Sequence, residues 1–338
     1  MRLRTSYAAI AGILFLLAGI FLYFNSPPAL MQEETFYVKD GEPVSHVAER
    51  LFKLNLVTSE RFFSLLAWIG ARDGIRKGKY RIQAGSSAIE ILSRFVRGDV
   101  VKHKVTFPEG FNMYMIAERL SKYEVVPAAE FLHYAADRAF LDSLRIGAPI
   151  AEGYLFPDTY IFAEESDVKD VIRAMSARFV SVMDGIELAP LKKLKLSLHE
   201  LIVLASLVEK EARVPRERAH VAAVFHNRLR KGMKLDCDPT VRYAVKKFGS
   251  ERITFADLAV NSPYNTYTVQ GLPPTPICSP GRESILAALH PADNDFLFFV
   301  ARNDGSHYFS KTLDEHNRAV DFYQKGIKNG FTDRQRLD

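Results

Sequence analysis

The hydrophobic residues form one long uninterrupted stretch near the start of the chain and many short amphipathic stretches after it. Residues 7–24 are uncharged and mostly apolar, and Arg2 and Arg4 precede them. A stretch of that length can cross a bilayer core, and the basic flank predicts a cytoplasmic N-terminus. A cleaved signal peptide is the alternative, but residues 25–28 (NSPP) offer a poor cleavage site. An uncleaved membrane anchor is therefore favoured, with the rest of the chain outside the cytoplasmic membrane.

Three later segments share one pattern, in which a turn containing glycine precedes residues at helical spacing. Gly41 and Gly110 each stand seven residues before the alanine of an AERL tetrad, and Gly85 precedes a fainter copy at residues 89–92. Each copy predicts a strand, a glycine turn and an amphipathic helix, which suggests a small module used more than once. The arrangement resembles the LysM-like modules that bind glycan chains of peptidoglycan. A generic β-turn-α unit explains the pattern equally well.

A strongly apolar helix is predicted at residues 198–211, and its sequence ends in ASLVEKE. Ser197 and Glu200 fit a capping box, which marks the helix start. At about 100° per residue, Glu211 lies on one flank of the apolar arc and Glu209 on the other. Desolvation and the helix dipole would both raise the pKa of such a carboxyl group, as a general acid requires. Solvated acids at a fraying helix end, before Pro215, are the alternative.

The chain after this helix contains further predicted elements. A helix is expected from Pro215 to about residue 229, and Asp238 is expected to cap another helix that has Pro239 at its first position. Residues 261–274 form a long non-helical segment with aromatic and amide side chains, of the kind that often carries function. Residues 296–309 predict a β-hairpin that turns at residues 303–305 (NDG), and a last helix is expected at 313–326.

Composition narrows the possible chemistry. The 338 residues include two cysteines, Cys237 and Cys278, without a CxxC pair, so a zinc site is not predicted. The chain contains no GxSxG, P-loop or GxGxxG motif. The net charge of +5 is mild, and the densest basic region, residues 213–234, lacks interleaved aromatic residues. A solvated helix face is therefore favoured over a nucleic-acid surface, although an anionic polymer could dock there.

Several blocks in order resemble the YceG-like family of endolytic murein transglycosylases, known as MltG. The blocks are 205–211 (ASLVEKE), 224–229 (VFHNRL), 238–241 (DPTV), 264–267 (YNTY), 271–274 (GLPP) and 290–292 (HPA), with 78–80 (GKY), 109–110 (EG) and 156–159 (FPDT) upstream. The resemblance covers residues from about 36 to 320. It implies that Glu211, the second glutamate of EKE, is the catalytic acid, and that Glu209 is structural and pairs with an arginine. Cys237 and His226 depart from the family pattern, and neither change is expected to touch the acid.

The resemblance implies a carbon–oxygen lyase that cleaves the β-1,4 bond between N-acetylmuramic acid and N-acetylglucosamine in nascent glycan strands. The products would carry 1,6-anhydro ends, and cleavage would end strand elongation. Candidate sugar-binding residues are Asn265, Tyr264 and Tyr267, while Asn227 and Asp238 are expected to shape the pocket. No cofactor or metal is implied, and the partners would be glycan strands and peptidoglycan synthases. A lysozyme-like muramidase and a non-catalytic glycan-binding scaffold remain the alternatives.

The predicted fold class is α+β, with an N-terminal transmembrane helix, small LysM-like modules and a mixed α+β catalytic domain. The expected divisions are a cytoplasmic tail at 1–6, the membrane helix at 7–24, a linker at 25–35, a LysM-like region at 36–105 and the catalytic domain at 106–330. The expected location is the cell (inner) membrane, with the catalytic domain in the periplasm or its equivalent.

Overall fold

The computed structural model describes residues 2–28, 33–72, 74–327, 331–333 and 335, and for residues 2–6, 8 and 9 it describes the backbone only. Within these residues the chain is a mixed α+β protein, as predicted. It forms two compact units, one of residues 1–104, 123–125 and 161–166, the other of residues 105–122, 126–160 and 167–338. The domain divisions expected from sequence stay predictions, because compactness alone does not show that either unit folds by itself.

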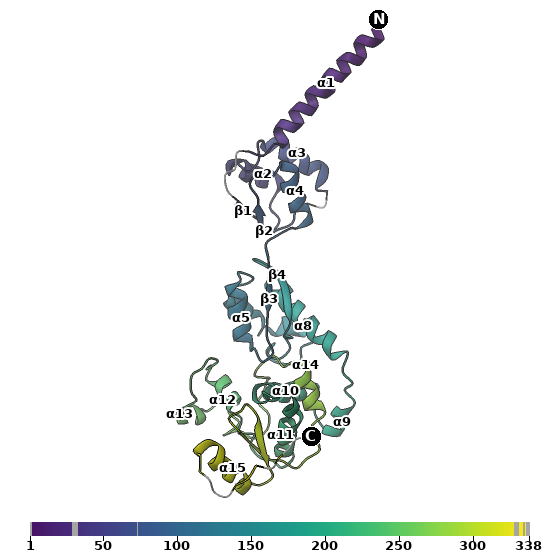
Figure 1. Ribbon diagram of the computed structural model, residues 1–338. Coiled ribbons are helices and arrows are strands. Elements are labelled where there is room, and N and C mark those ends of the chain that lie inside the picture. Colours follow the sequence, from purple (N-terminus) through teal and green to yellow (C-terminus); the bar gives the residue numbers. More distant parts are fainter. Residues whose placement is uncertain (1, 29–32, 73, 328–330, 334, 336–338) are drawn as a thin grey trace. The chain divides into compact units, whose positions relative to one another are not determined.

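The N-terminal helix α1 (Arg2–Asn25) covers the predicted apolar span (Figure 1). At its end, the rings of Phe21 and Phe24 pack against Phe62, with centroid distances of 5.6 and 5.9 Å. Where side chains are described, none of the helices combines the length and apolar character that crossing a membrane requires. Residue 1 and the side chains of 2–6, 8 and 9, in the predicted tail and span, lie outside the described part of the chain, as do residues 29–32 of the predicted linker.

The first unit is built around a two-stranded antiparallel sheet (Figure 1). Strand β1 (Glu34–Val38) pairs with β2 (Gly78–Ile82), so that Phe36 lies opposite Tyr80. Helices α2 (Val44–Lys53) and α3 (Glu60–Gly70) connect the strands, and α4 (Ala88–Arg97) follows β2. Phe36, Tyr80 and Phe95 are buried in one core, which explains why the strands carry aromatic residues on one face.

All three glycine-turn predictions are confirmed. Gly41 lies between β1 and α2, Gly85 between β2 and α4, and Gly110 between β3 (Lys102–Thr106) and α5 (Met113–Lys122). Each has a positive φ, of 67°, 81° and 77° respectively. Glycine adopts this region without the steric cost that a Cβ atom imposes, so the repeated glycine encodes the sharp turn itself.

The second unit is mostly helical (Figure 1). Strand β3 pairs with β4 (Thr159–Ala163), and each of these strands contains a boundary of the two units. The remaining elements before the candidate site are α6 (Ala128–Tyr134), α7 (Arg138–Ser143), α8 (Val168–Met183) and α9 (Pro190–Leu194). Those from the site onward are α10 (Leu198–Glu211), the 3-10 helix η1 (Pro215–Glu217), α11 (Arg218–Arg230), α12 (Asp238–Ala244), α13 (Phe255–Leu258), α14 (Arg282–Leu289), β5 (Phe298–Ala301), β6 (His307–Ser310) and α15 (Leu313–Lys325).

Helix α10 is the centre of this unit. It packs against α14, α11 and α12, and its residues 201–208 are all buried. Its start is the predicted capping box, in which the Ser197 hydroxyl accepts from the Glu200 amide and the Glu200 carboxylate accepts from the Ser197 amide. The hairpin prediction is also confirmed, since β5 and β6 pair antiparallel with Val300 opposite Tyr308.

Candidate active site

A cavity of about 780 Å³ opens at the C-terminal end of α10. The residues around it come from the end of α10 and the segment after it, the start of α5, helix α12 with the segment after it, the segment before α14, and the adjoining ends of β5 and β6 with the turn between them. They are Asn112, Met115, Lys210, Glu211, Arg213, Asp238, Pro239, Arg242, Tyr243, Lys247, Phe248, Gly249, Ser250, Ile277, Ala301, Asn303, Gly305 and His307. A volume of this size suits a drug-sized or disaccharide-sized ligand.

Glu211, the last residue of α10, borders this cavity. The residue keeps partial solvent exposure, but its carboxyl group is desolvated. The pKa of Glu211 is raised to about 7: desolvation is the largest cause and the nearby Asp238 charge adds to it, while a hydrogen bond from Cys237 and the Arg213 charge oppose it. The expected elevation of the acid's pKa is thus present, and it comes mainly from burial.

Cys237 contacts this acid directly. Its Sγ donates to Glu211 Oε1 at 3.3 Å, so the expectation that a cysteine at this position leaves the acid untouched is wrong. The contact links residues 26 apart in sequence and stabilises the carboxylate form of Glu211. Burial and the neighbouring carboxyl raise the pKa of the Cys237 thiol. Cys237 and Cys278 are both buried free thiols.

Removing this donor is expected to raise the pKa of Glu211. Cys237→Ala deletes a group that stabilises the carboxylate, so the protonated carboxyl group becomes relatively more stable. The titration midpoint of Glu211 therefore moves to higher pH. Cys237→Ser supplies a stronger donor and should move the midpoint the other way. Carbon-13 NMR titration of labelled glutamate measures both. Cys278→Ala is the matched control, since Cys278 Sγ donates to the Ser206 carbonyl instead; equal midpoints in all four proteins would contradict the prediction.

Glu209 lies on the other flank of α10. Its Oε2 accepts from the Gly281 amide at 3.1 Å and from the Ser284 hydroxyl at 2.7 Å. Both donors belong to the first turn of α14, whose unsatisfied amides and dipole favour a carboxylate. Glu209 therefore joins α10 to α14. The expected arginine partner is wrong, because the carboxylate binds the start of α14 instead.

Asp238 borders the same cavity, but its expected capping role is wrong. Cys237 occupies the N-cap position of α12, and Asp238 is already the first helical residue, followed by Pro239. Its Oδ1 accepts from the Tyr267 hydroxyl at 2.7 Å. The sequence predicted that the Asp238 carboxylate would accept from helix amides, but it accepts from Tyr267, in the segment 261–274, instead. Asp238 is the second carboxylate beside the cavity, after Glu211.

The three candidate sugar-binding residues of the YNTY block do not line the cavity. Asn265 is fully buried, and its side chain donates to the carbonyls of Leu258 and Val260 and accepts from the Tyr267 amide. These contacts order the loop and leave the amide out of reach of a sugar. The hydroxyl of Tyr264 pairs with Thr275 at 2.6 Å. Of the three, Tyr267 contacts a residue that lines the cavity, since its hydroxyl donates a hydrogen bond to Asp238.

Asn227 also lies away from the cavity. It is buried in α11, and its Nδ2 donates to the carbonyls of Asn294 and Phe296, both at 2.9 Å. The side chain therefore ties α11 to the segment that leads into β5, and does not shape the cavity wall. Its neighbour Arg228 is likewise structural, since it is buried and pairs with Asp236 at 2.8 Å.

Sequence reasoning missed Glu152. The structure buries this residue completely, and burial raises its pKa to about 8. It accepts from the Met113 amide and from the hydroxyl of Tyr243, which borders the cavity. The turn between β5 and β6, including His307, was also missed as a cavity wall. Only its hairpin character was visible in the sequence.

Comparison with known proteins identifies the fold and its relatives. The model of the YceG-like family matches residues 36–322. The chain belongs to the YceG-like family. The crystal structure of a protein described as YceG-like, from Listeria monocytogenes, is similar with a TM-score of 0.58 and 32% identity, and the match covers 85% of this chain and 99% of that one.

Proteins that carry a functional name are also similar to this chain. The Bacillus subtilis protein called endolytic murein transglycosylase is 33% identical over an alignment of 329 residues, and the match covers 91% of each chain. The protein of the same name from Streptococcus pneumoniae R6 is 30% identical over an alignment of 317 residues, and the match covers 85% of this chain and 57% of that one. This chain thus spans little more than half of the pneumococcal relative.

Proposed function

We propose that this protein is an endolytic murein transglycosylase. The substrate would be nascent peptidoglycan, cleaved at the β-1,4 bond between N-acetylmuramic acid and N-acetylglucosamine with formation of 1,6-anhydro ends. The relatives of that name support the reaction class. The observation that carries the proposal is Glu211, a carboxyl group beside a cavity of about 780 Å³, with a pKa raised by desolvation to about 7.

One carboxyl group can serve both halves of this reaction. Glu211 first donates its proton to the glycosidic oxygen, which leaves as the C4 hydroxyl of the next sugar as the C1–O bond breaks. The resulting carboxylate then takes the proton of the muramoyl C6 hydroxyl, whose oxygen bonds to C1 and closes the anhydro ring. Glu211 ends the cycle protonated, and no water is consumed.

Asp238 favours a second candidate, a lysozyme-like muramidase. Glycosidases that use water commonly need two carboxylates beside the scissile bond, and Asp238 borders the cavity together with Glu211. In that mechanism Asp238 would stabilise the glycosyl cation or bond to it, and the product would have a reducing muramic end. The two reactions differ by one water molecule in the product mass.

Product analysis tests the proposal directly. The purified protein is incubated with uncross-linked glycan strands, and the released fragments are analysed by mass spectrometry. Anhydro-muramic ends on internal fragments support the endolytic transglycosylase. Reducing ends alone would favour the muramidase, and intact strands would reject both reactions in favour of a glycan-binding scaffold.

The activity is expected to fall as pH rises through about 7. The free enzyme must start with Glu211 protonated, and the cited pKa of about 7 places the loss of that proton there. Measurement of kcat/KM between pH 5 and 9 should therefore show a descending limb with a midpoint near 7. The variant Cys237→Ala should move this limb to higher pH. An unchanged rate up to pH 9 would contradict the role of Glu211 as the proton donor.

The surroundings of the cavity suit an acidic glycan. Lys210, Arg213, Arg242 and Lys247 line it beside the two acids. Of these, Lys247 is neutralised by Asp257 at 2.6 Å. Muramic acid carries a lactyl carboxyl group, extended in nascent strands by an acidic stem peptide. Cationic side chains at the cavity rim would attract these groups without taking part in the bond cleavage.

We further propose a membrane-anchored arrangement for this activity. The support is the uncharged sequence at residues 7–24 and the exposure of apolar side chains along α1, such as Phe15. The first unit would serve as a LysM-like glycan-binding region, on the strength of its strand-turn-helix modules. Anchoring would confine cleavage to strands near the peptidoglycan synthases, with the catalytic unit outside the cytoplasmic membrane. Fractionation of cells that express the full chain, against a chain without residues 1–25, tests the anchor.

A further inference from the structure

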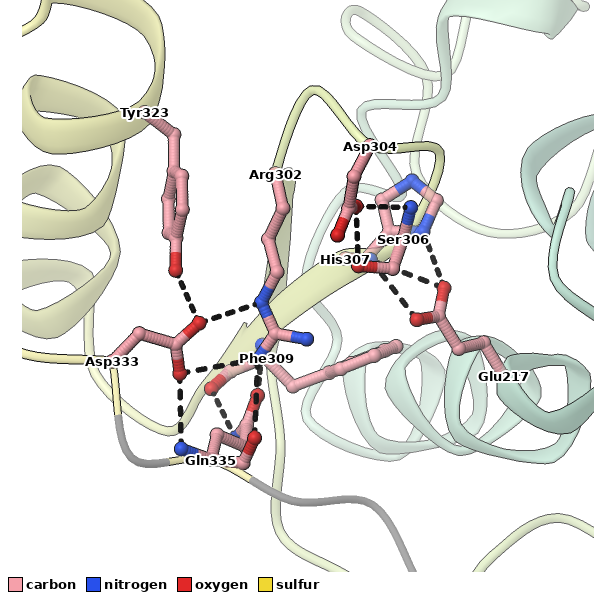
Figure 2. A network of polar contacts seen from close by, with 9 residues as sticks. All are labelled: Glu217, Arg302, Asp304, Ser306, His307, Phe309, Tyr323, Asp333 and Gln335. Carbon is pink, nitrogen blue, oxygen red and sulfur yellow. Dashed lines mark hydrogen bonds and ion pairs between the residues drawn. The ribbon is translucent and has the colours of Figure 1, made fainter.

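The turn between β5 and β6 brings a buried histidine–glutamate pair to the wall of the candidate site. His307, the first residue of β6, borders the cavity that Glu211 also borders. Glu217, at the end of η1, is fully buried and lies against it. Figure 2 shows the Glu217 carboxyl group bonded to both the ring and the backbone amide of His307. The distances are 2.8 Å to Nδ1, and 3.0 and 3.1 Å to the backbone nitrogen.

This contact fixes which ring nitrogen is left for a ligand. A carboxylate only accepts hydrogen bonds, so Nδ1 carries a proton, and Nε2 is the ring nitrogen that Glu217 does not bind. Among the residues that the structure describes, the hydrogen bonds of the His307 ring all go through Nδ1. His307 lines the cavity and keeps 8% exposure. Nε2 is therefore an oriented polar atom without a described protein partner.

The hairpin turn holds the histidine in this place. Asp304 Oδ1 accepts from both the amide and the hydroxyl of Ser306, at 2.9 and 2.6 Å (Figure 2). Asn303 and Gly305 have positive φ angles of 68° and 91°, as a tight hairpin turn requires. Phe299 packs edge-on against the imidazole with ring centroids 5.3 Å apart. A ring restrained by a buried carboxyl group and by packing loses little freedom when a ligand binds.

We propose that His307 is a substrate-contacting residue, whose Nε2 forms a hydrogen bond with a hydroxyl group of the sugar bound beside Glu211. Glu217 is the positioning residue that orients the ring. This inference rests on the proposed function for the identity of the ligand as a glycan. It adds a polar contact from the β5–β6 hairpin, which lies about 100 residues after Glu211 in the sequence.

The test uses the full-length Glu211→Gln protein, which cannot turn substrate over under the proposed mechanism, and measures the Kd for uncross-linked glycan strands. Adding His307→Asn keeps a donor at the Nδ1 position for Glu217 but deletes Nε2. The expected result is a Kd about tenfold weaker, in the range of one lost hydrogen bond. His220→Asn is the matched control, since this half-buried histidine bonds through Nδ1 to Asn294 and does not line the cavity. It should leave the Kd unchanged.

A second measurement needs no substitution at His307. In Glu211→Gln protein with nitrogen-15 histidine, glycan should move the His307 Nε2 resonance. An unchanged Kd in the His307→Asn protein, an equal loss in the His220→Asn protein, or an Nε2 resonance that glycan does not move would each overturn the inference. The proposed function fails separately, if Glu211→Gln protein binds glycan and wild-type protein leaves the strands intact.

Discussion

Replacement of Glu211 by glutamine is expected to remove anhydro-ended fragments from the digest of glycan strands, with a loss of activity of about 10²–10⁴-fold. Glutamine keeps the size of the side chain and the partner for Cys237, but it has no proton to donate at neutral pH. Glu211 is the cavity-lining acid whose pKa burial brings to about 7. The measurement is mass spectrometry of the fragments at matched protein concentration.

Glu209→Gln is the control for this variant. It makes the same glutamate-to-glutamine substitution in the same helix, α10. The Glu209 carboxylate, however, forms hydrogen bonds with the start of α14 and does not line the cavity. It should retain anhydro products while losing some stability.

The Glu211→Gln protein should remain folded. Folding raises the pKa of the Glu211 carboxyl group from 4.5 to about 7, so the free energy of unfolding of the wild-type protein falls as pH rises between these values. Glutamine does not titrate, so this decrease is absent from the Glu211→Gln protein. Wild-type product levels from Glu211→Gln would reject the assignment.

Local sequence determined many of the elements in both units. The capping box at Ser197, the glycine turns at residues 41, 85 and 110, and the hairpin at residues 303–305 were all predicted correctly. Each depends on residues within about five positions of one another, where backbone preferences and side-chain caps act directly. The mixed α+β class followed from the same short-range patterns.

The wall of the site could be predicted only in part. Glu211 and Asp238 do border the cavity, but Asn227, Tyr264, Asn265 and Tyr267 do not. A polar residue in a loop looks the same in sequence whether it faces a ligand or satisfies the loop's own carbonyl groups, as Asn265 does. The choice depends on backbone groups that only the folded loop brings together.

The contacts that tune the site join distant parts of the chain. Cys237 is 26 residues from Glu211, Tyr243 is 91 residues from Glu152, and His307 is 90 residues from Glu217. No periodicity or motif in a single sequence encodes such pairs. The aromatic residues next to Glu152 show the same limit, since Tyr154 and Phe156 are buried, each with 7% exposure.

Gly153 is the position where a single methyl group is expected to cost the most stability in the second unit. Its φ of +84° is strained for any residue with a Cβ atom, and an added Cβ would lie 2.4 Å from Pro276 Cγ and 3.1 Å from Ile202 Cγ2 of α10. Neither neighbour is a flexible chain end, so α10 or the segment at Pro276 would have to shift. The backbone strain and the overpacking together should cost about 3 kcal/mol or more.

The control for Gly153→Ala is Gly271→Ala, in the same unit. Gly271 has a similar φ of +89°, but an added Cβ would meet no atom within 4 Å, so only the backbone strain of about 1 kcal/mol remains. Thermal unfolding followed by circular dichroism should therefore place the Tm of Gly153→Ala about 4–8 °C below that of Gly271→Ala. Because Gly153 contacts α10 and adjoins the buried Glu152, the larger loss would show that the helix carrying Glu211 is held by this close approach. Equal Tm values would show that the packing at Pro276 yields without cost.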